Sequence, residues 1–362
     1  MERVKLNNTE LQRQLDLFKS QTKIELQVKD GKPYYGGWLD LQGTAITSLP
    51  DNLMVGGSLN LYRTAITSLP DNLVVGGSLN LYRTAITSLP DNLVVGGWLD
   101  LQGTAITSLP DNLMVGGSLN LYRTAITSLP DNLVVGGSLN LKGTAITSLP
   151  DNLVVGGWLD LQETAITSLP DNLVVGGWLD LQEPAITSLP DNLVVGGWLY
   201  LQETQITDTS NVNRNAPTLY EWHNGKYIKV DGIFSAVDNY HGNVYKVHQI
   251  GNKKQMYVVG DGNGKWAHGE TIDEARKDLI YKISKRDKSA FKNLKLDSVL
   301  TFEQAIECYR VITGACSAGT KDYIVNRLPK PHKNKYSIRE MIELTKDEYQ
   351  GEAFETFFAN KQ

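Results

Sequence analysis

The chain contains few cysteines, few histidines and no long apolar run. Two cysteines among 362 residues, Cys308 and Cys316, are too few for a disulfide framework. The five histidines are scattered, and neither CxxC nor HExxH occurs, so ligand spacing predicts no metal site, and we expect no cofactor. No segment is predicted to span a membrane, and the first residues lack the apolar run of a cleavable signal peptide. These absences favour the cytoplasm, with secretion that leaves no cleavable signal as the alternative.

Basic residues are scarce in the first half of the chain. Between residues 31 and 208, five basic residues oppose sixteen acidic ones, a net charge of −11, whereas residues 209–362 carry +5. An acidic segment repels the phosphates of nucleic acids. We therefore expect no nucleic acid partner for this segment.

The dominant feature is a sequence of twenty residues that occurs nine times. Each copy reads Gly-Gly-x-Leu-x-Leu-x-x-Thr-Ala-Ile-Thr-Ser-Leu-Pro-Asp-Asn-Leu-x-Val with few exceptions. The copies begin at Gly36, Gly56, Gly76, Gly96, Gly116, Gly136, Gly156, Gly176 and Gly196. A fixed period of this length predicts a solenoid, because each unit can bury its apolar face only against the next one.

The spacing of the apolar residues resembles a leucine-rich repeat. In the second copy, the pattern L-x-L-x-x-T-x-I-x-x-L-P-x-x-L runs from Leu59 to Leu73. It resembles the short, twenty-residue bacterial subfamily of the secreted-effector type, which carries Leu-Pro in its second half. The resemblance implies an α/β-type repeat solenoid with a parallel β-sheet on its concave face. A β-helix is the rival fold, and a second strand at Ala65–Ser68 would favour it.

One departure from that family is regular. The usual asparagine of the motif is replaced by threonine at Thr44, Thr64, Thr84, Thr104, Thr124, Thr144, Thr164 and Thr204. A threonine hydroxyl can satisfy neighbouring backbone groups, whereas Pro184 interrupts the series and has neither a hydroxyl nor an N–H.

The composition predicts four segments. Residues 1–35 are expected to cap the solenoid: Thr9 and Gln12 form a capping-box pattern, and Leu11, Leu15 and Phe18 share one side of a helix. A strand at Lys23–Val28 would follow. The solenoid itself occupies 36–208, a polar linker 209–217, and a small α+β domain 218–362.

The last segment combines strand and helix signals. Strands are predicted at Lys226–Val230, Val244–Gln249 and Gln255–Val259, and the glycine-rich run 260–264 is predicted as a hairpin turn because it lacks the Lys-Ser/Thr of a phosphate loop. Three capping boxes predict helix starts, at Thr271 with Glu274, Thr301 with Gln304 and Ser337 with Glu340. A further helix is expected near Lys321–Leu328.

Cys316 is the one candidate for catalysis. It lies in a loop of small residues between two predicted helices, where the N-terminus of the second helix would favour a thiolate. The alternative is a small buried side chain. Some effectors with similar repeats carry a ubiquitin-ligase domain with a catalytic Cys-x-Asp, but neither cysteine here is followed by that aspartate, so this activity is not inferred. AHGETIDEAR and YRVITGACSAGT resemble an uncharacterised domain of phage- and prophage-encoded repeat proteins, which implies no activity.

The copies differ from one another mainly at three alternating positions, equivalent to 58, 60 and 62. Because alternate residues of a strand face opposite sides, these positions point away from the core, onto what we call the concave sheet surface. One cassette is Trp-Leu-Asp-Leu-Gln, and the other is Ser-Leu-Asn-Leu-Tyr-Arg. Candidate partner-binding residues are Trp158, Trp178, Trp198, Asp160, Asp180, Tyr62, Tyr82, Arg63, Arg83, Tyr122 and Tyr200.

These patterns favour a protein-binding module. Exposed aromatic side chains next to carboxylates suit a protein partner with a basic or mixed surface. The tryptophans could instead only cover the neighbouring glycines and one another. The alternative function is a cysteine-dependent enzyme that uses Cys316 and whose repeats recruit the substrate. A third possibility is a bacterial or phage-encoded inhibitor that occludes a host protein.

Overall fold

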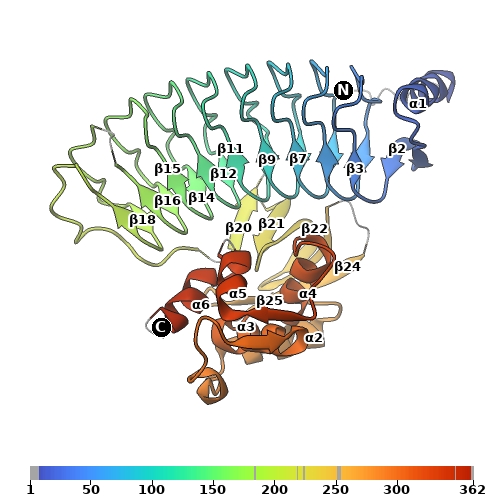
Figure 1. Ribbon diagram of the computed structural model, residues 1–362. Helices are drawn as coiled ribbons and strands as arrows, with labels where there is room; N and C mark the ends of the chain where they lie inside the picture. Colours follow the sequence, from blue (N-terminus) through green and yellow to red (C-terminus); the bar gives the residue numbers. More distant parts are fainter. Residues whose placement is uncertain are drawn as a thin grey trace. The chain divides into compact units, whose positions relative to one another are not determined.

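The computed structural model describes residues 8–182, 185–217, 219–222, 225–250, 254–346 and 348–359 (Figure 1). The chain forms two compact units, one comprising the chain up to Ala216 and the other most of the chain after it. The first unit is a repeat solenoid and the second a small α+β domain. None of the helices that the structure describes has the length and apolar character of a membrane-spanning segment.

The solenoid begins with helix α1 (Asn8–Thr22) and a hairpin of β1 (Gln27–Lys29) and β2 (Lys32–Tyr35). Phe18 is buried in the core of the solenoid and Leu15 packs against that core. Gln14 binds Asp51 of the first turn twice, through its amide nitrogen at 2.9 Å and its oxygen at 3.0 Å. Two details differ from the prediction. The described part of the helix includes Asn8, so Thr9 lies inside the helix and does not cap it, and β2, not the segment 23–28, joins the parallel sheet.

Each coil contributes two short strands that flank its Gly-Gly pair. A nine-stranded parallel sheet follows the glycines, and the eight strands that precede them extend the hairpin to a ten-stranded sheet (Figure 1). The first set is β3 (Leu39–Asp40), β5 (Leu59–Asn60), β7 (Leu79–Asn80), β9 (Leu99–Asp100), β11 (Leu119–Asn120), β13 (Leu139–Asn140), β15 (Leu159–Asp160), β17 (Leu179–Asp180) and β19 (Leu199–Tyr200). The second set is β4 (Met54–Val55), β6 (Val74–Val75), β8 (Val94–Val95), β10 (Met114–Val115), β12 (Val134–Val135), β14 (Val154–Val155), β16 (Val174–Val175) and β18 (Val194–Val195).

The glycines are required because successive coils approach one another most closely there. A Cβ atom on Gly96 would lie 2.2 Å from the carbonyl oxygen of Gly76, and one on Gly57 would lie 2.7 Å from the carbonyl carbon of Gly37. No side chain fits at such distances. The Gly-Gly pair is therefore a packing requirement of the coil.

One continuous core fills the solenoid. The leucines, isoleucine and second valine of each copy are buried in it, as the repeat pattern predicts. Each described threonine of the regular series donates a hydrogen bond from Oγ1 to the carbonyl oxygen three residues earlier, at 2.6–2.8 Å, as at Thr64 and Leu61. The interrupting Pro184 lies outside the described residues. Ala65–Ser68 forms no strand, so the feature that would favour a β-helix is not found and the fold is the leucine-rich-repeat solenoid.

The predicted linker 209–217 continues the solenoid. Val212 is buried in the core, and Asn213 pairs with Val194 in the parallel direction. Arg214 donates from Nη1 to the carbonyl oxygen of Gly197 at 2.8 Å. The segment therefore covers the last coil, because its polar side chains satisfy backbone groups that a further coil would otherwise satisfy.

The second unit contains an antiparallel six-stranded sheet. Its strands occur in chain order: β20 (Leu219–Trp222), β21 (Tyr227–Val230), β22 (Ile233–His241), β23 (Val244–Gln249), β24 (Gln255–Gly260) and β25 (Trp266–Gly269). The three predicted strands correspond to β21, β23 and β24, and residues 260–264 connect β24 to β25 as a hairpin. The sequence reading missed β20, β22 and β25.

Helices follow the sheet. They are α2 (Ile272–Ile283), the short 3-10 helix η1 (Ser289–Phe291), α3 (Phe302–Thr313), α4 (Ser317–Asn326), α5 (Ile338–Thr345) and α6 (Gly351–Phe358). Strand β26 (Val299–Thr301) precedes α3 and strand β27 (Lys335–Ser337) precedes α5. The two strands pair in the antiparallel direction. All three predicted capping boxes form. Helix α4 begins at Ser317, earlier than predicted, because Cys316 takes the N-cap position.

Candidate functional site

The variable positions of the solenoid align across successive coils. The parallel register pairs Leu159 with Leu179 and Leu179 with Leu199, so the residues on either side of these leucines also lie in rows. The concave sheet surface consequently carries one row of Trp or Ser, one of Asp, Asn or Tyr, and one of Gln, Tyr or Lys.

The middle row also has a structural role. In eight coils the Asp or Asn accepts a hydrogen bond at Oδ1 from the main-chain N–H two residues later, at 2.9–3.1 Å, as at Asp160 and Gln162. Aspartate and asparagine are equivalent for this turn. The charge at Asp160 and Asp180 is therefore free to vary without a change in the coil.

Aromatic and basic side chains gather in the earlier coils. The rings of Tyr62 and Tyr82 stack, with centroids 5.3 Å apart and planes at 16°. The guanidinium groups of Arg63 and Arg83 each lie 5.0 Å from the centroid of the preceding tyrosine ring. Arg123 and Tyr122 repeat this arrangement, also at 5.0 Å. All three arginines are exposed.

Tryptophans and carboxylates gather in the last coils. Trp158 is half-buried, whereas Trp178 is 39% exposed and Trp198 is 64% exposed. The ring of Trp178 meets that of Tyr200 edge-on, at a centroid distance of 6.2 Å. One side of the Trp178 ring also covers Gly197. A Cβ atom added to that glycine would lie 2.9 Å from Cδ1 of Trp178. Trp178 thus has both a packing contact and a large exposed face.

Hydrogen bonds and ion pairs connect these rows. Gln162 donates from Nε2 to Oδ2 of Asp180 at 2.7 Å and accepts at Oε1 from Lys142 at 2.6 Å. Glu163 lies 3.4 Å from Nζ of Lys142 and 3.7 Å from Nη2 of Arg123. Burial, opposed by the hydrogen bond from Gln162 and assisted by the charge of Asp180, raises the pKa of Asp160. The exposed arginines lie in the earlier coils, together with Asp40 and Asp100, whereas carboxylates predominate in the last coils.

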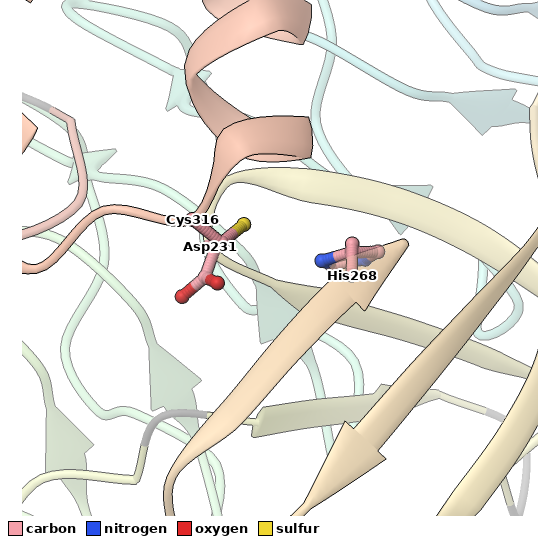
Figure 2. Close-up of side chains that lie close together, drawn as sticks. All are labelled: Asp231, His268 and Cys316. Carbon is pink, nitrogen blue, oxygen red and sulfur yellow. The ribbon is translucent and has the colours of Figure 1, made fainter. Parts of the chain in front are cut away.

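The α+β domain contains a second cluster, which is buried. Asp231 lies in the turn after β21, His268 in β25, and Cys316 at the N-cap of α4. One potential ligand atom from each of the three residues lies within 4.8 Å of the others, and Figure 2 shows a ring nitrogen of His268 on the side that faces Asp231 and Cys316. Next to the cluster is a cavity of about 30 Å³, lined in part by Asp231, Cys316 and Tyr349.

A lysine neutralises the carboxylate of this cluster. Nζ of Lys282 donates to Oδ1 of Asp231 and, at 2.6 Å, to the carbonyl oxygen of Trp266, and it lies 4.2 Å from the centroid of the Tyr349 ring. Although burial alone would lower it, the neighbouring carboxylate holds the pKa of Lys282 above its ordinary value. Burial lowers the pKa of His268 to about 4, so this imidazole is neutral at pH 7.

The environment of Cys316 differs from the one predicted for a nucleophile. The sequence places Cys316 correctly before a helix, and Sγ accepts the main-chain N–H of Gly319 at 3.2 Å. Its side chain is nevertheless fully buried, and burial together with the charge of Asp231 raises its pKa well above the ordinary value. A reactive thiolate needs a lowered pKa and access to solvent. Cys316 has neither in this structure, which agrees with a small buried side chain.

Sequence reading missed three features of these sites. Trp38 and Trp98 are exposed on the same row as the predicted tryptophans, and the cassette pattern could have added them. Gln162 is a connecting residue that no motif marks. The cluster of Asp231, His268 and Cys316 has no signal in the sequence, because its members are 37 and 48 residues apart and only the fold brings them together.

Fold and surface together define the class: a leucine-rich-repeat solenoid protein with an appended α+β domain. A scan against known protein families and a search of curated proteins found no match. Among solved structures, YopM from Yersinia enterocolitica WA-314 is similar, with a TM-score of 0.33 and 22% sequence identity. The match covers 51% of this chain and 45% of that chain, and it concerns the fold alone. The resemblance of the C-terminal segment to phage-encoded proteins stays a prediction.

Proposed function

We propose that the chain is a protein-binding module whose concave sheet surface receives one partner protein. The observation that carries this proposal is the separation of two kinds of position. Invariant residues build the core, the Gly-Gly contacts and the turns, whereas nearly all variation lies in aligned, outward-pointing rows. Variation confined to one surface is what selection for a partner would produce, since the fold itself tolerates either cassette.

The residues expected to contribute most to binding are the aromatic ones. Trp178 and Trp198 are exposed, and interface hot spots are enriched in tryptophan, tyrosine and arginine. The stacked pair Tyr62 and Tyr82, with Arg63 and Arg83 above the rings, forms a second anchor region in the earlier coils. Binding energy should therefore be concentrated in two regions, with Gln162 and its neighbours between them.

The charges suggest how the partner lies on this surface. Arg63, Arg83 and Arg123 project from the earlier coils, whereas Asp160, Asp180 and Glu163 lie in the later ones. A partner of mixed charge would place acidic residues against the arginines and basic residues against the carboxylates, which would fix its direction. In line with the resemblance to effectors of this repeat type, we propose that the partner is a host protein and that the chain acts as an effector or inhibitor.

Site-specific photo-crosslinking in the full-length protein tests this proposal. Benzoylphenylalanine replaces Trp178 in one variant and the exposed Ser168, which lies in the turn on the other side of the coil, in a control variant. In lysates of bacterial and of animal cells, the Trp178 variant should capture one discrete protein that the Ser168 variant does not capture. Equal capture from both positions, or capture from Ser168 alone, would contradict a role for the concave sheet surface.

A further inference from the structure

The buried cluster of the α+β domain contains polar atoms that lack any partner. Both ring nitrogens of His268 and Oδ2 of Asp231 are buried and make no hydrogen bond in the structure. A buried polar atom without a partner is destabilising, and each instance in a folded protein calls for an explanation. Here the three atoms belong to two neighbouring side chains, with the sulfur of Cys316 beside them (Figure 2).

The spacing of these atoms does not fit a catalytic triad. A triad requires hydrogen bonds from the imidazole to the thiol and to the carboxylate, and neither ring nitrogen of His268 makes one. Metal ligands need a wider spacing than hydrogen-bonded groups, since ligands about 2.0–2.3 Å from a tetrahedral zinc ion lie about 3.3–3.8 Å from one another. Ligand atoms that lie within 4.8 Å of one another can close around an ion with small side-chain movements.

Neighbouring groups already orient the three side chains. Lys282 contacts Oδ1 of Asp231, the carbonyl oxygen of Trp266 and the ring of Tyr349. Oδ2 of Asp231 makes no hydrogen bond and is therefore left for a ligand. The main-chain N–H of Gly319 donates to Sγ of Cys316 at 3.2 Å. Hydrogen bonds of this kind hold ligands in place and stabilise a metal-bound thiolate.

We propose that Asp231, His268 and Cys316 bind one zinc ion, with a water molecule in the adjoining cavity as the fourth ligand. Sulfur and imidazole ligands select zinc over magnesium and calcium, which prefer oxygen. The cavity of about 30 Å³ has room for that water. On binding, the Cys316 thiol loses its proton to solvent and the sulfur forms a bond to zinc. The positive charge of Lys282 beside the site repels the ion and weakens its binding. We therefore expect chelators to remove it.

Metal content and cobalt substitution of the untagged full-length protein test the proposal. The purified protein should contain about one equivalent of zinc, which EDTA removes. Cobalt added to the stripped protein should bind at one equivalent and produce the near-ultraviolet absorption of a thiolate-to-cobalt transition. Cys308→Ser is the matched control, because Cys308 is equally buried but lies in a separate core. It should keep the absorption, and Cys316→Ser and His268→Gln should lose it.

The readout does not depend on the folding of the Cys316 variant. The chain has only two cysteines. A thiolate band that survives in Cys308→Ser therefore assigns the ligand to Cys316, whether or not Cys316→Ser folds. Zinc should also raise the Tm of the stripped wild type, since a ligand that binds only the folded state stabilises it. A wild type that binds less than about a fifth of an equivalent, or a band lost only in Cys308→Ser, would overturn the proposal.

Discussion

Oγ of Ser138 accepts a hydrogen bond from the main-chain N–H of Trp158 in the next coil, at 3.0 Å. Ser78 makes the same contact with Trp98, at 3.1 Å, and Ser58 and Ser118 contact the serine of the following coil in this way. Serine and tryptophan thus alternate at one position of a coil whose backbone does not change. The fold therefore accepts either residue at this position of the concave sheet surface.

This equivalence predicts that Trp178→Ser leaves the solenoid stable. The serine hydroxyl would accept the N–H of Trp198, as in the coils that carry serine, and the loss of cover over Gly197 is a surface effect. Surface changes of this kind alter the free energy of unfolding by no more than about 0.5 kcal/mol, or about 2 °C in Tm for a protein of this size. Thermal unfolding monitored by circular dichroism measures this, and a drop above about 8 °C would show that the tryptophans mainly pack.

Removing the charge of Asp160 and Asp180 is predicted to slow association with the partner. Asp160→Asn with Asp180→Asn keeps the turn, because asparagine makes the same contact at Asn60 and Asn140. The association rate should fall and depend less on salt, while the dissociation rate changes little. Stopped-flow or surface-plasmon measurements at two salt concentrations give both rates. An unchanged association rate would contradict the predicted role of these carboxylates.

The raised pKa of Asp160 predicts how the stability of the protein depends on pH. Burial raises this pKa in the folded state, so the folded state holds the proton more tightly than the unfolded state does. The corresponding contribution to the free energy of unfolding is present below the ordinary aspartate pKa and is lost as pH rises through the raised value. Urea unfolding from pH 3 to 7 should therefore show Asp160→Asn gaining stability relative to wild type over that window. The exposed Asp40 provides the control, and an equal gain in Asp40→Asn would contradict the account.

Deleting whole coils is predicted to preserve the fold, because each coil stabilises mainly its neighbours. Removal of Gly96 to Val135, forty residues, joins two coils in register and should yield a shorter folded solenoid. Removal of residues 1–35 should instead expose the core that Phe18 covers and cause aggregation. Circular dichroism and size-exclusion chromatography compare the two, and a harmless cap deletion together with an unfolded coil deletion would contradict the solenoid account.

Cys316 is predicted to react slowly in the folded protein. Its side chain is fully buried, and burial raises its pKa, so EDTA-treated native protein should contain almost no accessible thiolate at pH 7–9. Iodoacetamide should label it no faster than Cys308 and much more slowly than in the denatured chain. Mass spectrometry of the labelled peptides measures both rates. Faster labelling in the native protein than in the denatured protein would favour the enzyme hypothesis.

The sequence predicted most of the solenoid because its physical requirements recur every twenty residues. The buried leucines and the hydrogen bonds of the threonines follow from one copy, whereas the close approach of successive coils at the glycine pairs was seen only in the structure. It did not predict that Asn72 and Asn172 bond to the asparagines of the preceding coils, at 3.2 Å, since such bonds depend on the spacing of coils. Nor did it predict a structural role for Asp160, because the same residue also suits a binding surface.

The α+β domain was less predictable because it has no repeat. The capping boxes located three helix starts, since each depends on four consecutive residues. Strand β22 was missed because its second half, from Asp238 to His241, is polar and the register shifts between Val237 and Asn239. The cluster of Asp231, His268 and Cys316 depends on tertiary packing alone, and no local pattern in the sequence indicates it.

The most direct test of the central claim is the Kd of the partner complex for wild type and Trp178→Ser, measured by isothermal titration calorimetry once crosslinking has identified the partner. If the concave sheet surface binds through its aromatic side chains, the substitution should weaken binding by about 2 kcal/mol or more, which is about 30-fold in Kd, at an unchanged Tm. An unchanged Kd with a strongly lowered Tm would contradict the claim, because the tryptophans would then serve packing and not recognition.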